Sequence, residues 1–204
     1  MALTNCYCTI EQARIAIGLK VDDETQDTEL ELIVNATCRL IDDAVDRPHG
    51  FWVDGSVTTR EYDVDDLHCV DVEDISTTTG LIVKLDDGSG TYPTTLTLGT
   101  DFVLLPRNAD KRYPVRPFEQ IQAGGGTTFL VNNNGLASMQ VTAKHGWPAV
   151  PPNATLATTV QLERLFKSSP FGVVELGEGM AWRLSAKLHP DSALLLEGLS
   201  KVYA

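Results

Sequence analysis

The residue types that could do chemistry are histidine, cysteine, paired carboxylates and a glycine-rich run, and the chain contains all of them. His68 next to Cys69 could supply a base and a nucleophile. The pair lies in an alternating stretch typical of a strand, where neighbouring side chains point to opposite faces, so neither is expected to activate the other. The other histidines and cysteines lack the short paired spacings of zinc ligands, and we expect reduced structural thiols at Cys6, Cys8, Cys38 and Cys69.

Adjacent acids, such as Asp65 with Asp66, invite a glycosidase or calcium interpretation. The Asp-x-Asx-x-Asx-Gly calcium loop is missing from the sequence, and adjacent acids in turns are usually solvated. Residues 124–126 are three glycines, but no Gly-Lys-Ser/Thr follows and Thr127 is expected to begin a strand, so the run predicts a hairpin loop and not a phosphate site. We therefore expect no enzymatic activity, no catalytic residue, no metal site and no cofactor.

The charge of the chain argues against attraction to nucleic acid. Its 204 residues include 28 acidic and 16 basic side chains, a net charge of −12, which repels a polyanion. The last quarter, residues 151–204, differs because it holds five acids and five bases. No apolar run approaches the roughly 20 residues of a membrane helix and the N-terminus does not resemble a signal peptide, so neither membrane insertion nor secretion is expected.

Three helices are predicted from capping and periodicity. Thr9 to Gln12 forms a capping box that begins a short helix, which should end at Gly18. A long helix is expected over about 24–47, since apolar residues recur there at spacings of three and four. A second long helix should begin at Pro151-Pro152, stop before Pro170 and pack on the first.

Between the long helices the period changes to alternation. Short threonine- and valine-rich runs, separated by Gly, Asp and Pro, predict antiparallel strands at residues 57–65, 67–72, 81–85, 94–98, 102–105 and 139–143. Asp87-Gly88 and Asn134-Gly135 are hairpin signals. The expected fold is α+β: a small helical bundle of two long helices and a short N-terminal helix, with an inserted antiparallel β region and an extended C-terminal tail. The expected parts are residues 1–50 (N-terminal helices), 51–150 (β insert), 151–170 (closing helix) and 171–204 (tail).

The tail is rich in apolar residues and poor in charge. Such a segment is too apolar to remain in water and poorly built to form its own core, so we expect it to dock onto another chain, with one weak helix near 190–199. Deleting residues 171–204 is then expected to leave a folded domain. Docking onto the parent domain is the alternative.

Several segments together resemble the head-to-tail connector, or adaptor, proteins of long-tailed double-stranded DNA bacteriophages, especially those infecting actinobacteria. The resemblance covers most of the chain and rests on the order of five segments: Tyr7-Cys8-Thr9 with Leu19 to Asp23; Ala36 to Pro48; Gly146 to Pro152; Arg164-Leu165-Phe166 leading into Ser169 to Val173; and Leu188-His189-Pro190-Asp191 before Leu194-Leu195. The last four residues, Lys201-Val202-Tyr203-Ala204, depart from the family pattern, for which a more basic C-terminus is expected.

The resemblance implies a structural protein of the virion neck, assembled in the host cytoplasm. The implied assembly is a ring, usually of twelve copies, bound beneath the portal protein and presenting its other end to stopper, tail-completion or tail proteins. It implies that genomic DNA passes through the ring without sequence-specific binding. It also implies that the tail reaches the portal, with candidate anchors at Phe171, Trp182, Arg183, Leu184, Leu188, Pro190, Leu194, Leu195 and Leu199.

A ring through which DNA must slide needs walls that do not bind phosphate. The acids in and around the first long helix could supply that repulsion. The candidates for lining the channel are Asp22, Asp23, Glu24, Asp27, Glu31, Asp42 and Asp43.

Three other interpretations of the sequence remain open. One is a different neck ring, such as a stopper or tail-completion protein. Another is a β-rich carbohydrate-binding module, which predicts an exposed aromatic platform drawn from Trp52, Tyr62, Tyr92, Tyr113 and Trp147. The third is an enzyme that uses its carboxylates, which predicts a strongly perturbed acid in a pocket.

Overall fold

The computed structural model describes residues 2–47, 49–111, 113–129, 138–168 and 188–200. The chain divides into two compact units: a helical unit, Met1–Trp52 with Val150–Ala204, and a β unit, Val53–Ala149. In the described residues, no helix is both long and apolar enough to cross a membrane.

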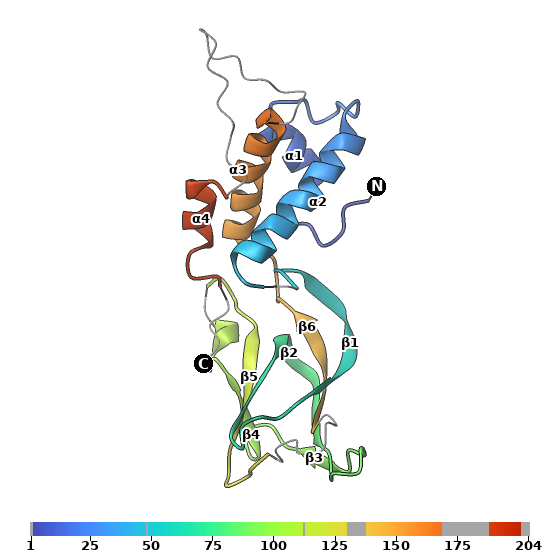
Figure 1. The fold of residues 1–204 in the computed structure, drawn as a ribbon, viewed down its shortest axis with the longest axis vertical. Helices are drawn as coiled ribbons and strands as arrows, with labels where there is room; N and C mark the ends of the chain where they lie inside the picture. The colour runs from blue at the N-terminus through green and yellow to red at the C-terminus, as the bar shows by residue number, and fades with distance from the viewer. Residues whose placement is uncertain (1, 48, 112, 130–137, 169–187, 201–204) are drawn as a thin grey trace. The chain divides into compact units, whose positions relative to one another are not determined.

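The helical unit contains α1 (Ile10–Ala16), α2 (Asp27–Ala44), α3 (Pro152–Ser168) and α4 (Pro190–Leu196) (Figure 1). The capping box at the start of α1 is confirmed, because the Thr9 hydroxyl accepts from the Gln12 N–H while the Gln12 side chain accepts from the Thr9 N–H. Gly18, with φ of 86°, follows the end of this helix. Helix α3 contacts α1, α2 and α4, so it lies at the centre of this unit.

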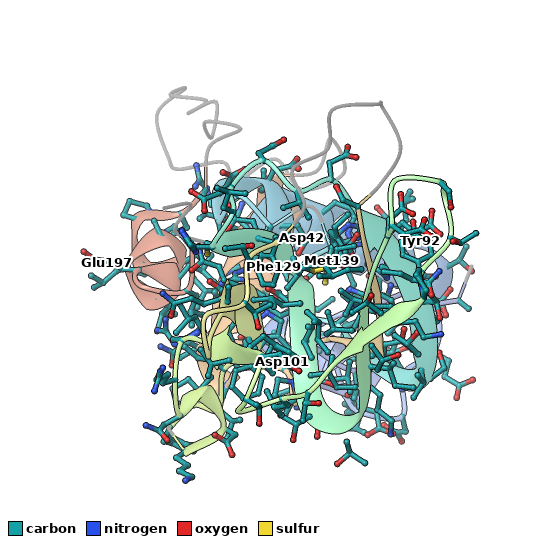
Figure 2. The ribbon with its side chains drawn as sticks, turned by 90° about the horizontal axis from the view of Figure 1, so that it is seen from below. Asp42, Tyr92, Asp101, Phe129, Met139 and Glu197 are labelled. Carbon is teal, nitrogen blue, oxygen red and sulfur yellow. The ribbon has the colours of Figure 1, made fainter. Side chains whose placement is uncertain are left out.

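The β unit is a six-stranded sheet in which every ladder is antiparallel. Its strands are β1 (Val53–Tyr62), β2 (Cys69–Leu85), β3 (Thr94–Leu96), β4 (Phe102–Leu105), β5 (Phe118–Ala123) and β6 (Met139–Gly146). The strand order is β1-β6-β2-β5-β4, and β3 pairs with β2. One apolar cluster fills the unit and includes Phe129 and Met139, which are labelled near the centre of Figure 2.

The predicted fold class is wrong. The largest feature is a mostly antiparallel sheet of six strands, accompanied by four short helices, and not a bundle built on two long helices. One reason is that most of the predicted run at 67–72 and all of the run at 81–85 belong to one 17-residue strand, β2. Between them Thr77 pairs with β6 and the register shifts before Ile82. The β region is inserted in the sequence between the two parts of the helical unit, and it encloses a core of its own.

Two further predictions about the β region have different outcomes. Residues 127–129 do not form the expected strand, and β5, which the sequence reading missed, pairs with both β2 and β4. The hairpin expected at Asn134-Gly135 lies outside the described residues.

Candidate functional site

The seven acids predicted to line a channel differ in their exposure. Asp22, Glu24 and Asp43 are exposed, Asp23, Asp27 and Glu31 are half-buried, and Asp42 is 2% exposed. Asp27 pairs with Arg14, whose Nε lies 2.9 Å from Asp27 Oδ1, and Asp23 accepts from the Thr25 N–H at 3.1 Å. Asp42 is therefore a residue of the interior, and the surface candidates on the helical unit are the exposed acids.

Asp42 belongs to a buried polar cluster that joins the N-terminal segment to α2. The Tyr7 hydroxyl donates to Asp42 Oδ1, and Arg39 Nε lies 3.0 Å from Asp42 Oδ2. The Tyr7 oxygen also accepts from the Phe51 N–H at 2.9 Å, so one side chain connects three parts of the chain. Sequence analysis missed this cluster because its members are up to 44 residues apart.

Burial determines how Asp42 titrates. Removal from water raises the pKa of Asp42 from its usual 3.8 to about 6, although the Tyr7 hydroxyl and the Arg39 guanidinium both act to lower it. The pKa of Tyr7 is raised, first by burial and then by its bond to the Asp42 carboxylate. Asp42 lines neither of the two grooves described below.

We predict that Asp42→Asn flattens the pH dependence of stability between pH 4 and pH 6. The folded unit binds the Asp42 proton more tightly than the unfolded chain does, so stability should fall as pH rises through this window, by roughly 3 kcal/mol at most. The asparagine has no proton to lose. Urea unfolding at several pH values would measure the effect, with Asp43→Asn, at the exposed neighbouring position, as the control. An unchanged slope in Asp42→Asn would contradict the account.

The C-terminal helix α4 docks within the helical unit. Leu196 and Leu199 are buried, and the Ser192 hydroxyl donates to the Ala157 carbonyl at 3.1 Å. Arg47 Nε donates to the Leu199 carbonyl at 2.7 Å. A chain that ends at residue 170 would lose these contacts, and the expectation that it still folds stays a prediction.

A shallow apolar groove lies between the end of α2 and α4. It has a volume of about 500 Å³, and its lining includes three of the predicted portal anchors, Leu188, Pro190 and Leu194. Leu194 is 69% exposed to solvent, and the Glu197 side chain just after α4 projects outward (Figure 2). An apolar side chain with this exposure beside a groove can bind an apolar segment of another protein.

The other predicted portal anchors divide into two groups. Leu195 is half-buried and Leu199 is buried by its own chain, so Leu199 is not available to a partner in this structure. Phe171, Trp182, Arg183 and Leu184 lie outside the described residues.

A second groove, which sequence analysis did not identify, lies between α1 and α3. It is lined by Ile15, Val150, Pro152 and Leu156, among others. Ile15 and Leu156 are exposed. In the sequence, each of these two residues is only an apolar side chain on the outer face of a helix. Such a side chain alone indicates no function.

The aromatic platform of the carbohydrate-binding alternative does not form as expected. Trp147 is fully buried, and its Nε1 donates to Asp74 at 2.9 Å. The side chains of Trp52, Tyr62 and Tyr92 are half-buried. Tyr113 is highly exposed. Among the described residues, no three His, Cys, Asp or Glu side chains are grouped so that they could hold a metal ion.

Comparison with known proteins gives a likeness in structure but none in sequence. No family model matches the chain, and no curated protein matches its sequence. The structure resembles a chain of a solved structure described as "Neck of empty GTA particle computed with C6 symmetry", where GTA denotes a gene transfer agent, a phage-like particle. The match has a TM-score of 0.55 and 14% sequence identity, and it covers 100% of this chain and 94% of that chain. The chain therefore shares its fold, over its whole length, with a component of the neck of a phage-like particle.

Proposed function

We propose that the chain is a structural, non-enzymatic protein of the neck of a phage-type particle, located in the virion after assembly in the host cytoplasm. The observation that carries this proposal is the structural match to a chain of a GTA neck, which extends over the whole of this chain. The resemblance of five sequence segments to actinobacteriophage adaptors supports the same class independently of the fold.

Within the neck, we propose that the chain is the head-to-tail adaptor. Copies would form a ring, of twelve subunits as in the adaptor family, bound to the portal protein on one side and to stopper or tail proteins on the other. The apolar groove at α4 supports a portal contact, because three predicted anchors line it and Leu194 is exposed there. Apolar anchors in a groove are typical of the energetically dominant part of an interface.

The exposed acids of the helical unit are proposed to face the DNA channel. In that position they would repel the phosphate backbone and let the genome slide, since each favourable phosphate contact would add affinity and hold the DNA in place. Asp22, Glu24 and Asp43 are the exposed candidates.

Reversing two of these charges should slow DNA release. We expect particles that carry Glu24→Lys with Asp43→Lys to eject DNA several-fold more slowly than wild type, roughly in line with two added phosphate contacts per copy. The difference should shrink as salt is raised, because ions screen those contacts. Glu11→Lys with Glu163→Lys makes the same change of net charge elsewhere on the helical unit and is the matched control. Equal ejection rates for the two double variants would contradict the placement of Glu24 and Asp43 in the channel.

Co-sedimentation of the purified chain with capsids tests the proposed role. The chain should pellet with DNA-filled capsids that contain the portal and remain in the supernatant with capsids assembled without it. Binding to isolated tails, with no binding to either capsid, would identify a tail-completion protein instead. Binding to both capsids alike would contradict a portal partner.

A further inference from the structure

The connection between β4 and β5, residues 106–117, is basic in a chain whose net charge is −12. Its sequence holds four Lys and Arg residues and one acid, Asp110. Arg107 and Lys111 are exposed. We call residues 106–117 the basic loop.

The basic loop is held against the core of the β unit and presents an aromatic side chain to solvent. Ala109 is fully buried in the apolar cluster, and the Arg116 N–H donates to the Ala109 carbonyl at 3.2 Å. The single turn Ala109–Lys111 is a 3-10 helix. Tyr113 lies just beyond this turn and is 90% exposed. Tyrosine and arginine are the residue types most enriched at binding hot spots, so an exposed tyrosine among basic residues fits an interaction surface.

A segment of opposite charge lies at the other end of the same unit. Residues 61–68, here called the acidic segment, hold four Asp and Glu residues and no Lys or Arg. All four acids, Glu61, Asp63, Asp65 and Asp66, are exposed, and Leu67 among them is 48% exposed. Like the basic loop, but with the opposite charge, the acidic segment presents an exposed apolar side chain among exposed charged ones.

The register of the sheet places the two surfaces apart. In the β2–β5 ladder Cys69 pairs with Gln122 and Ile75 pairs with Phe118. The basic loop leads into Phe118 and the turn at residues 63–68 leads into Cys69, so the loop and this turn lie at opposite ends of the ladder (Figure 1). The basic loop and the acidic segment are therefore separate surfaces of one copy.

We propose that two copies of this chain join head to tail through their β units, with the basic loop of one copy seated on the acidic segment of the next and Tyr113 packed against Leu67. The inference rests on the proposed ring, because a closed ring of identical subunits needs a heterologous interface made of two different surfaces. Charge complementarity favours a second copy as the occupant, since every copy carries the acidic counterpart of its own basic loop.

A charge exchange between the two surfaces tests the proposal. The loop variant is Arg107→Glu with Lys111→Glu, and the segment variant is Asp63→Lys with Asp65→Lys. The segment variant keeps Asp66, whose carboxylate accepts from the N–H groups of His68 and Cys69 and holds the turn. Each variant alone brings two reversed side chains against like charges on the next copy, whereas an equal mixture allows alternating copies to pair correctly.

The readouts are the number of copies bound per portal-bearing capsid and the self-association of the free proteins in the analytical ultracentrifuge at low salt. We expect each variant alone to fall at least tenfold below wild type in self-association and in bound copies. The equal mixture, and a chain carrying all four substitutions, should return to near the wild-type value. Recovery also shows that both variants fold.

Several results would overturn the proposal. Variants that assemble like wild type, or a mixture as defective as its components, would exclude this interface. Loss of binding to a short DNA duplex by the loop variant, with unchanged self-association, would instead assign the basic loop to DNA. If wild-type chain ignores capsids, the neck proposal fails, and the ultracentrifuge comparison still decides whether the charge-paired interface exists.

Discussion

Gly50→Ala should destabilise the helical unit by about 3–4 kcal/mol, a large part of the 5–15 kcal/mol that keeps a domain of ordinary stability folded. Gly50 has a φ of 61°, in the left-handed region, and a Cβ there would overlap the Tyr7 hydroxyl and lie 2.5 Å from Asp42 Oδ1. The alanine therefore strains the backbone and also forces Tyr7 away from Asp42. Leaving Asp42 Oδ1 without the Tyr7 donor adds the cost of an unsatisfied buried acceptor.

Gly18→Ala is the matched control for this prediction. Gly18 has a φ of 86°, so the backbone strain is similar, but a Cβ there meets no atom within 4 Å. We expect a loss of about 1 kcal/mol, the usual penalty for alanine in a left-handed conformation. Urea unfolding followed by circular dichroism measures both variants. If Gly50→Ala costs no more than Gly18→Ala, the cluster of Tyr7 and Asp42 is not a significant source of stability.

Leu194→Gln should weaken binding to portal-bearing capsids at least tenfold while leaving the fold intact. Leu194 is 69% exposed, so the free protein loses little when the side chain becomes polar. In the proposed complex the same side chain would be buried in the portal contact, and full burial of a leucine side chain contributes about 1.5–3 kcal/mol. Each 1.4 kcal/mol corresponds to about a tenfold change in affinity. Co-sedimentation at a series of protein concentrations measures the shift.

Leu156→Gln controls for a general loss of surface hydrophobicity. Leu156 is 52% exposed and lines the groove between α1 and α3, away from the predicted anchors. It should bind capsids as wild type does. Equal losses of capsid binding for Leu156→Gln and Leu194→Gln, or no loss for Leu194→Gln, would contradict the proposal that α4 contacts the portal.

Local features of the fold could be predicted from the sequence. The capping box at Thr9, the end of the first helix near Gly18 and the short strand Phe102–Leu105 each depend on residues that are near neighbours in the chain. Capping and alternation are short-range effects, so a single sequence contains the information.

Features that depend on distant partners could not be predicted in this way. Asp42 lies on an amphipathic helix full of acids, and only its contact with Tyr7, 35 residues away, shows that it is buried. The docking of α4 depends on Arg47 and Leu199, which are 152 residues apart. Strand β5 buries Phe118 and Ile121 three residues apart, so it lacks a clean alternation and is recognised only by its ladders with β2 and β4. The predicted bundle was wrong for the same reason, since helical periodicity is visible locally and a sheet core is not.

Electron microscopy of the purified protein mixed with portal-bearing, DNA-filled capsids from the same particle tests the central claim most directly, with light scattering of the protein alone giving its starting size. The account predicts added ring-shaped density beneath the portal vertex, present only when the protein is added. A protein that leaves the vertex unchanged at every concentration tested would contradict the assignment to the neck.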